Sequence, residues 1–433
     1  MKEGFTVPHR NVFVLGLDDV NLEILQGLPG ADEYRFHTLV PPDEILDLEN
    51  LDFEDLLEKT HRHLEDFAGT VDAIIGYWDF PVSSLVPLLG ERLGLPSPNL
   101  RAVVACEHKY WSRRLQARAI DEVPAFASVQ LDDPRPPEGV GYPMWLKPVK
   151  SASSALAIKV EDPSEFDAAI AEIESGIDEY GVPFDQLLGH IELPPEIAEV
   201  GGRACLAEAA ATGRQATVEG YMVDGRATVY GVVDSVLYPD SPSFHHYEYP
   251  SHLPGHVTER LSELSRRVME EIDLGSGSFN IEWFWDPDTD RIALLEVNPR
   301  HSQSHAALFE HVDGVANHHV MLQLGLGNDP TMPTGEGPYG AAGRFWMRHF
   351  NDAVVRKAPD RARLEQVQEE IPGVSFDMVV EEGTRLSELP HQDAYSYELA
   401  VMVVAARDHE ELQAKYERVV EALAFELDDI EED

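Results

Sequence analysis

Two apolar, β-rich runs, residues 279–285 (FNIEWFW) and 292–297 (IALLEV), are separated by the turn-forming sequence DPDTD. This pattern predicts the two strands of a β-hairpin. Because side chains alternate between the faces of a strand, Glu296 and Asn298 share one face, and the hairpin can bring Glu282 against them. Two carboxylates and an amide oxygen form a hard oxygen set suited to Mg²⁺. A solvated acidic hairpin without such a role is the alternative.

Near the N-terminus, apolar runs alternate with helical periodicity. Strands are expected at 11–17 and 71–76, and helices at 20–28 and 82–93, the second ending at Gly94. This order predicts an α/β unit. Only Gly16 lies near the end of the first strand, so the dinucleotide-binding glycine fingerprint is absent.

The middle of the chain reads as further strands. Residues 142–160 predict strand, small-residue loop and strand, and residues 204–236 predict one strand followed by a hairpin that turns at Asp224-Gly225. The aromatic, proline-rich stretch 238–256 is too irregular for a strand, and we expect a substrate loop there. Its paired histidines, His245 and His246, are interpreted as loop residues, because no carboxylate or cysteine completes a metal site at a recognisable spacing.

Composition limits the function classes. With 79 acidic and 33 basic residues, the formal net charge is −46, which disfavours nucleic acid and anionic membranes as partners. There are no apolar runs of membrane-spanning length and no signal-peptide pattern, and the two cysteines suggest no disulfide framework. We expect a cytoplasmic protein with small-molecule substrates, and a homodimer is left open. The lysine-poor, dispersed acidity indicates either a high-salt cytoplasm or an arginine-favouring genome.

Lysines are unevenly distributed. Of eight in the chain, four (Lys109, Lys147, Lys150 and Lys159) fall within residues 109–159, and none occurs between Lys159 and Lys357. A compact ammonium group is a good partner for phosphate. Two of the cluster, Lys150 and Lys159, are interpreted as surface residues.

The segment G-x-F-N-I-E-x-F…L-L-E-V-N-P-R resembles the metal-binding hairpin of the ATP-grasp superfamily, which joins carboxylates to nucleophiles through acyl phosphates. The resemblance implies ATP and Mg²⁺ (or Mn²⁺) as cofactors, and an α/β fold with an α+β lid. It also implies a Rossmann-like pre-ATP-grasp domain at 1–105, an ATP-grasp domain at 106–330 and a small β-rich C-terminal domain at 335–433. The lid would span about 143–212, and the metal hairpin 279–300.

Site residues follow from the same resemblance. The metal ligands would be Glu282, Glu296 and Asn298, and Arg300 would face the phosphates and the substrate as the catalytic cation. The nucleotide would be bound by Lys109, Lys147, Ser153, Ser154, Glu208, Ala211 and Gln215. His305 is a candidate general base or, equally, a structural histidine that holds the loop. Arg344 is a candidate for binding the substrate carboxylate, with a surface role as the alternative. Glu219 is expected to be structural or to face the substrate.

These features predict an ATP-dependent carboxylate–amine ligase that releases ADP and phosphate. One alternative is a biotin-carboxylase-like enzyme, but that class needs a glutamate where this chain has Ser304, and a lysine between hinge and hairpin. The other is a non-catalytic ATP-binding regulator, favoured by the lack of glycine in the loop 151–155.

Overall fold

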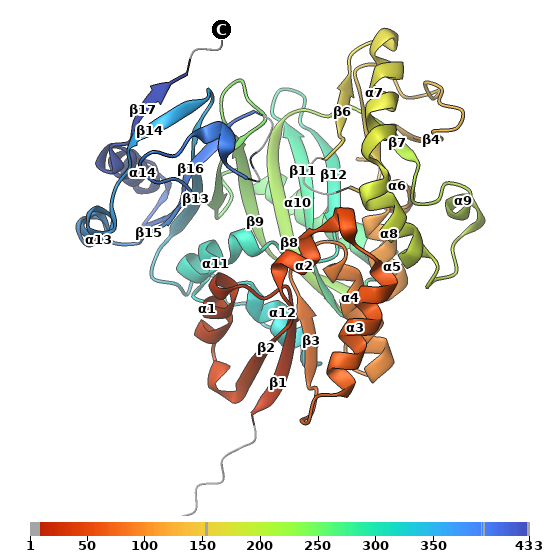
Figure 1. Ribbon diagram of the computed structural model, residues 1–433, viewed down its shortest axis with the longest axis horizontal. Coiled ribbons are helices and arrows are strands. Elements are labelled where there is room, and N and C mark those ends of the chain that lie inside the picture. The colour runs from red at the N-terminus through yellow and green to blue at the C-terminus, as the bar shows by residue number, and fades with distance from the viewer. Residues whose placement is uncertain (1–8, 152–154, 391, 393–394, 431–433) are drawn as a thin grey trace, which may run out of the picture.

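The computed structural model describes residues 9–151, 155–390, 392 and 395–430. Figure 1 shows the N-terminal strands at the bottom, the elements of residues 126–209 at the right and the C-terminal elements at the upper left. Among the described residues, the helices are all too short or too polar to cross a membrane.

The N-terminal part is built on a three-stranded parallel sheet in the order β2-β1-β3. Side chains of the central strand alternate between two apolar clusters: Phe13 and Leu15 pack on one face, and Val12 and Val14 on the other. A parallel strand buried on both faces is typical of a sheet covered by helices, so the predicted α/β unit is confirmed. The elements are β1 (Arg10–Leu15), α1 (Asp19–Gly27), β2 (Tyr34–Val40), α2 (Pro42–Leu46), α3 (Phe53–Glu65), β3 (Ala73–Gly76), α4 (Val82–Leu93) and α5 (Leu100–Glu107).

The following residues form a separate four-stranded sheet in the order β4-β7-β5-β6, and we refer to this sheet with its helices as the lid. The predicted strand, loop and strand of residues 142–160 correspond to β5 and β6, and an additional strand, β4, precedes the expected start of the lid. The elements are α6 (Lys109–Ala119), β4 (Phe126–Val129), β5 (Met144–Pro148), β6 (Ile158–Val160), α7 (Pro163–Gly176), α8 (Asp178–Leu188), α9 (Pro195–Ala198) and β7 (Cys205–Ala209).

The largest sheet has eight strands in the order β12-β11-β8-β9-β10-β13-β16-β15. Its turns follow the sequence: β8 and β9 join at Asp224-Gly225, which both have positive φ, and β11 and β12 join across the DPDTD segment. The elements of this part are β8 (Arg214–Val223), β9 (Arg226–Leu237), β10 (Phe244–Tyr249), α10 (Gly255–Ile272), β11 (Gly277–Asp286), β12 (Arg291–Asn298), α11 (Ala306–Asp313) and α12 (His318–Gly325).

The C-terminal part continues this sheet, because β13 pairs with β10 and β16 pairs with β13. The strands expected near 343–349 and 397–405 and the final helix are all present. The elements are β13 (Ala341–His349), β14 (Ala353–Lys357), α13 (Arg361–Glu370), β15 (Val374–Met378), β16 (Tyr397–Ala406), α14 (His409–Leu423) and β17 (Glu426–Asp429). The domain limits given above stay a prediction.

One expectation was wrong. Residues Phe244–Tyr249 are not an irregular loop but the strand β10, paired with β9 on one side and β13 on the other. The alternation of aromatic and polar residues in FHHYEY fits a strand between two neighbours, and the flanking prolines only mark its ends.

Candidate active site

The hairpin β11–β12 brings the predicted metal ligands together. Glu282 lies directly opposite Glu296, and Asn280 lies opposite Asn298 with its side-chain oxygen 2.9 Å from the Asn298 amide nitrogen. Burial and then the charge of Glu296 raise the pKa of Glu282 to about 7. A divalent cation between the two carboxylates would remove this repulsion, so the residues present fit Mg²⁺.

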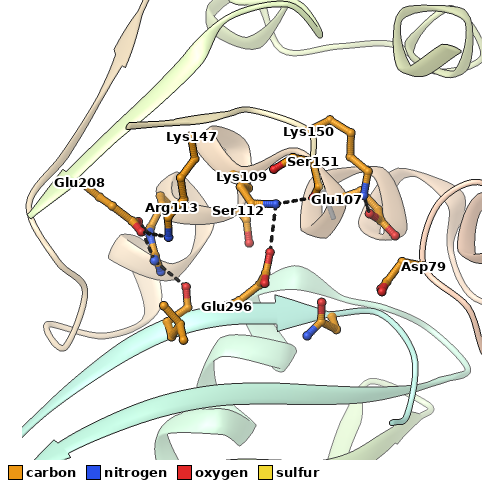
Figure 2. A network of polar contacts seen from close by, with 12 residues as sticks. Asp79, Glu107, Lys109, Ser112, Arg113, Lys147, Lys150, Ser151, Glu208 and Glu296 are labelled. Atoms are coloured by element: carbon orange, nitrogen blue, oxygen red, sulfur yellow. Dashed lines mark hydrogen bonds and ion pairs between the residues drawn. The ribbon is translucent and has the colours of Figure 1, made fainter. Parts of the chain in front are cut away.

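Lys109 connects three parts of the site. It begins α6, and its Nζ lies 3.1 Å from Oε1 of Glu296 and donates a 2.8 Å hydrogen bond to the carbonyl of Ser151 in the lid. Figure 2 shows this ammonium group between the lid loop and the hairpin. Although burial acts to raise the pKa of Glu296, the charges of Lys109 and Lys147 lower it below its ordinary value. The two carboxylates of the hairpin therefore differ in protonation near neutral pH.

Lys147 belongs to a buried ion-pair group at the inner face of the lid. It contacts Glu208, which also accepts hydrogen bonds of 2.9 and 2.8 Å from Arg113. Burial alone would raise the pKa of Glu208, but the charges of Arg113 and Lys147 outweigh it and lower that pKa to about 2. Arg113 also donates a 2.6 Å hydrogen bond to the carbonyl of Leu295, so it joins the lid to the hairpin.

The space enclosed by these groups is small. A cavity of about 30 Å³ is bordered by Lys109, Lys147, Glu208 and Glu296 among others. Small-molecule sites usually need roughly 300 Å³ or more. A nucleotide can therefore enter between lid and hairpin only if the lid moves away or the pairs of Glu208 open.

Arg300 is held by the N-terminal part of the chain. Its guanidinium donates two hydrogen bonds, of 2.8 and 2.6 Å, to the carboxylate of Asp79, just after β3. Burial acts to raise the pKa of Asp79, but Arg300 lowers it below its ordinary value, so both groups are charged. This fork-to-fork pair fixes the guanidinium plane beside the metal hairpin.

A second buried group lies beside the hairpin. Glu219 is fully buried and accepts hydrogen bonds from Tyr230 (2.9 Å) and the backbone nitrogen of Ser302 (3.0 Å). Nδ1 of His305 lies 2.8 Å from the same carboxylate. When Nδ1 carries the proton, the other ring nitrogen is a base, which is the orientation a general base requires.

Arg344 lies near this histidine. It is opposite Tyr247 in the pairing of β13 with β10, and the Tyr247 ring is 4.9 Å from that of His305. Among the described residues, the buried Nε of Arg344 has no hydrogen-bond partner. A cationic group in this state suits an anionic ligand.

Other predicted residues are placed differently. Gln215 donates a 2.9 Å hydrogen bond to Glu282 and so contacts the metal hairpin directly. Ala211 lines an open groove of about 560 Å³ between the end of β7 and the hairpin turn. Ser153 and Ser154 lie outside the described residues.

The interpretation of Lys150 as a surface residue was wrong. Lys150 is 3% exposed and is paired with the buried Glu107, whereas Lys159 is exposed and lies 2.6 Å from Glu161. Sequence reasoning also missed Arg113, although its position one helical turn after Lys109 was an available signal. Asp79 carried no such signal, because its partner is 221 residues away.

Comparisons with known proteins give matches in sequence and in fold. Residues 140–306 match the family model described as the ATP-grasp domain. This segment is similar to an ATP-grasp domain. In sequence, a 69-residue segment is 36% identical to part of the carbamoyl phosphate synthase large chain of Arthrobacter sp. (strain FB24). This segment is 16% of this chain and only 6% of that relative.

Solved structures share their fold with nearly the whole chain. An L-amino acid ligase from Bacillus licheniformis has a TM-score of 0.69 at 16% identity, covering 99% of this chain and 100% of that one. The N5-carboxyaminoimidazole synthase of Aspergillus clavatus reaches 0.64 at 14% identity, covering 96% and 99%. Biotin carboxylase of Campylobacter jejuni also reaches 0.64 at 14% identity, covering 96% and 92%.

Proposed function

We propose that this protein is an ATP-dependent carboxylate–amine ligase that forms a C–N bond through an acyl phosphate and releases ADP and phosphate. The observation that carries the proposal is the direct opposition of Glu282 and Glu296, with Lys109 against the hairpin. Paired carboxylates beside a lysine form the charge pattern that a magnesium–nucleotide complex needs.

In this proposal Glu282, Glu296 and Asn298 hold Mg²⁺ (or Mn²⁺), which would neutralise the nucleotide phosphates. Lys109 and Lys147 offset further phosphate charge. A substrate carboxylate oxygen attacks the γ-phosphorus and ADP leaves. Arg300, held in place by Asp79, stabilises the charge on the phosphoryl group during this transfer.

The second step is attack of an amine on the acyl carbon, with release of phosphate. We infer that His305 accepts the amine proton through the ring nitrogen that does not face Glu219. We infer that Arg344, whose Nε lacks a partner among the described residues, binds a second anionic group of a substrate. The lid excludes water, which would otherwise hydrolyse the acyl phosphate.

A carboxylase of the biotin type is the second candidate, because the fold matches biotin carboxylase closely. The residues disfavour it: Ser304 stands where that class needs a glutamate, and the chain has no lysine from residue 160 to 356. We further infer a cytoplasmic enzyme that acts on small molecules.

The test is a screen of carboxylate and amine pairs for ADP release in the presence of Mg²⁺. We expect ADP release that requires both the carboxylate and the amine and that is lost in the Glu296→Gln variant. Release that depends on bicarbonate instead of a carboxylate–amine pair would contradict the ligase proposal and favour the carboxylase.

A further inference from the structure

Three potential metal ligands, two of them four residues apart and the third in the C-terminal part, meet on the face of β10 that is turned away from the candidate active site. They are Glu248 on β10, His252 in the segment before α10, and His409, the first residue of α14. One ligand atom from each lies within 4.8 Å of the other two. Their neighbour Tyr247 points to the opposite face, where it contacts His305. The cluster is therefore separate from the hairpin β11–β12.

The contacts within the cluster are close. Oε1 of Glu248 contacts Nδ1 of His409, and its Oε2 lies 3.2 Å from Nε2 of His246. The imidazole rings of His252 and His409 stack with centroids 3.8 Å apart and an interplanar angle of 29°. An ion pair between Glu248 and His409 accounts for that contact, but it does not explain why a second imidazole stacks on the first.

The segment carrying His252 is held in place. Asp234, opposite Glu248 in the pairing of β9 with β10, accepts a 2.7 Å hydrogen bond from the backbone nitrogen of His252 and a contact from Ser251. Asp234 and Glu248 together give the cluster two carboxylates, which favour a cation over an anion.

Two imidazole nitrogens and one carboxylate oxygen form a ligand set typical of Zn²⁺ sites that keep a water in the fourth position. Zinc–ligand bonds of about 2.0–2.1 Å place tetrahedral ligand atoms roughly 3.3 Å apart. In this cluster the ligand atoms lie at most about 1.5 Å farther apart than that. The exposed His252 side chain can close this difference by a change of rotamer.

We propose that Glu248, His252 and His409 bind one Zn²⁺ ion, with a water molecule as the fourth ligand. Binding displaces the proton shared by His409 and Glu248 to solvent and leaves both imidazoles neutral. The ion joins the start of α14 to β10 and to the segment before α10, so it fastens the C-terminal part to the central sheet. This proposal does not depend on the ligase activity.

The experiment measures zinc retained after chelator-stripped protein is loaded with Zn²⁺ and passed over a desalting column. The proteins compared are the wild type, His252→Ala, His409→Ala, Glu296→Gln and His256→Ala. The last is a matched control, because His256 is an exposed histidine four positions after His252 whose ring lies 3.9 Å from Asp290. The Glu296→Gln variant removes the other carboxylate pair as a source of bound metal.

We expect one zinc ion per chain in the wild type, Glu296→Gln and His256→Ala, and none in the two cluster variants. Zinc should also raise the melting temperature of the wild type and leave that of His252→Ala unchanged. If His409→Ala fails to fold, His252→Ala decides alone, since its side chain is exposed. No retained zinc in the wild type, equal retention in His252→Ala, or loss only in Glu296→Gln would overturn the proposal.

Discussion

Glu282→Gln should stabilise the metal-free protein at neutral and alkaline pH. The folded state raises the pKa of Glu282 from 4.5 to about 7, chiefly through burial and the charge of Glu296. A carboxyl group whose folded pKa is raised costs no stability below the unfolded value of 4.5. Its cost grows as the pH rises and is complete above the folded pKa of about 7. Glutamine keeps the size and the contact with Gln215 but carries no charge.

The magnitude follows from the shift. At about 1.4 kcal/mol per pKa unit, the ionised Glu282 costs the folded state about 3 kcal/mol above pH 7. With an unfolding entropy of about 2.1 cal/mol/K per residue, 433 residues unfolding together would convert this into roughly 3 °C of melting temperature. The difference should vanish near pH 4.5, where Glu282 is still protonated in the fold.

Differential scanning calorimetry in a chelator, between about pH 4.5 and pH 8, measures the melting temperatures of the wild type and of Glu282→Gln. The matched control is Glu259→Gln, an exposed glutamate on α10, which should follow the wild type at every pH. Added Mg²⁺ should stabilise the wild type and have a smaller effect on Glu282→Gln. The reasoning is refuted if Glu282→Gln melts at or below the wild-type temperature at pH 8 in the chelator.

Three further predictions concern catalysis and salt. Lys147→Ala should lower turnover at least about a hundredfold at saturating ATP and Mg²⁺, because the role proposed for this ammonium group is to offset phosphate charge. Lys159→Ala, a change to an exposed lysine of the same lid, should not, and equal turnover in both variants would contradict the assignment. Asp79→Asn should reduce turnover roughly tenfold to a hundredfold, because it weakens the charged hydrogen bonding that holds Arg300 by about 1.5–3 kcal/mol. An unchanged steady-state rate would show that this ion pair is not needed. The chain has 79 acidic and 33 basic residues, so its melting temperature should rise between 0.01 M and 1 M KCl, as the Debye length falls from about 30 to about 3 Å. The rise should be larger than in sucrose, which does not screen charge. A melting temperature that stays constant with KCl would exclude a salt-adapted surface.

The local parts of the fold and the site could be predicted from sequence. The hairpin of Glu282 and Glu296 has a two-residue alternation and a marked turn, both of which are encoded within about twenty residues. The same holds for the helix ending at Gly94, whose φ of 66° needs a residue tolerant of the left-handed region.

Contacts between distant segments were not accessible in this way. Asp79 and Arg300 meet only because β3 ends beside the hairpin, and His409 reaches Glu248 only because β13 continues the sheet. The strand β10 was misjudged for a related reason, since one of its two pairing partners, β13, lies about ninety residues further along the chain. Lys150 looked exposed because its buried partner, Glu107, belongs to helix α5, 43 residues earlier in the chain.

The central claim is that a carboxylate is activated as an acyl phosphate. It is tested most directly by supplying a competent acid whose carboxylate is labelled with a heavy oxygen isotope, and analysing the released products by mass spectrometry. With an acyl phosphate as the intermediate, we expect ADP to be formed and one labelled oxygen to appear in the inorganic phosphate. The carboxylate oxygen that attacks the γ-phosphorus stays bonded to phosphorus when the amine displaces the phosphate. AMP carrying the label, with unlabelled pyrophosphate, would contradict the account.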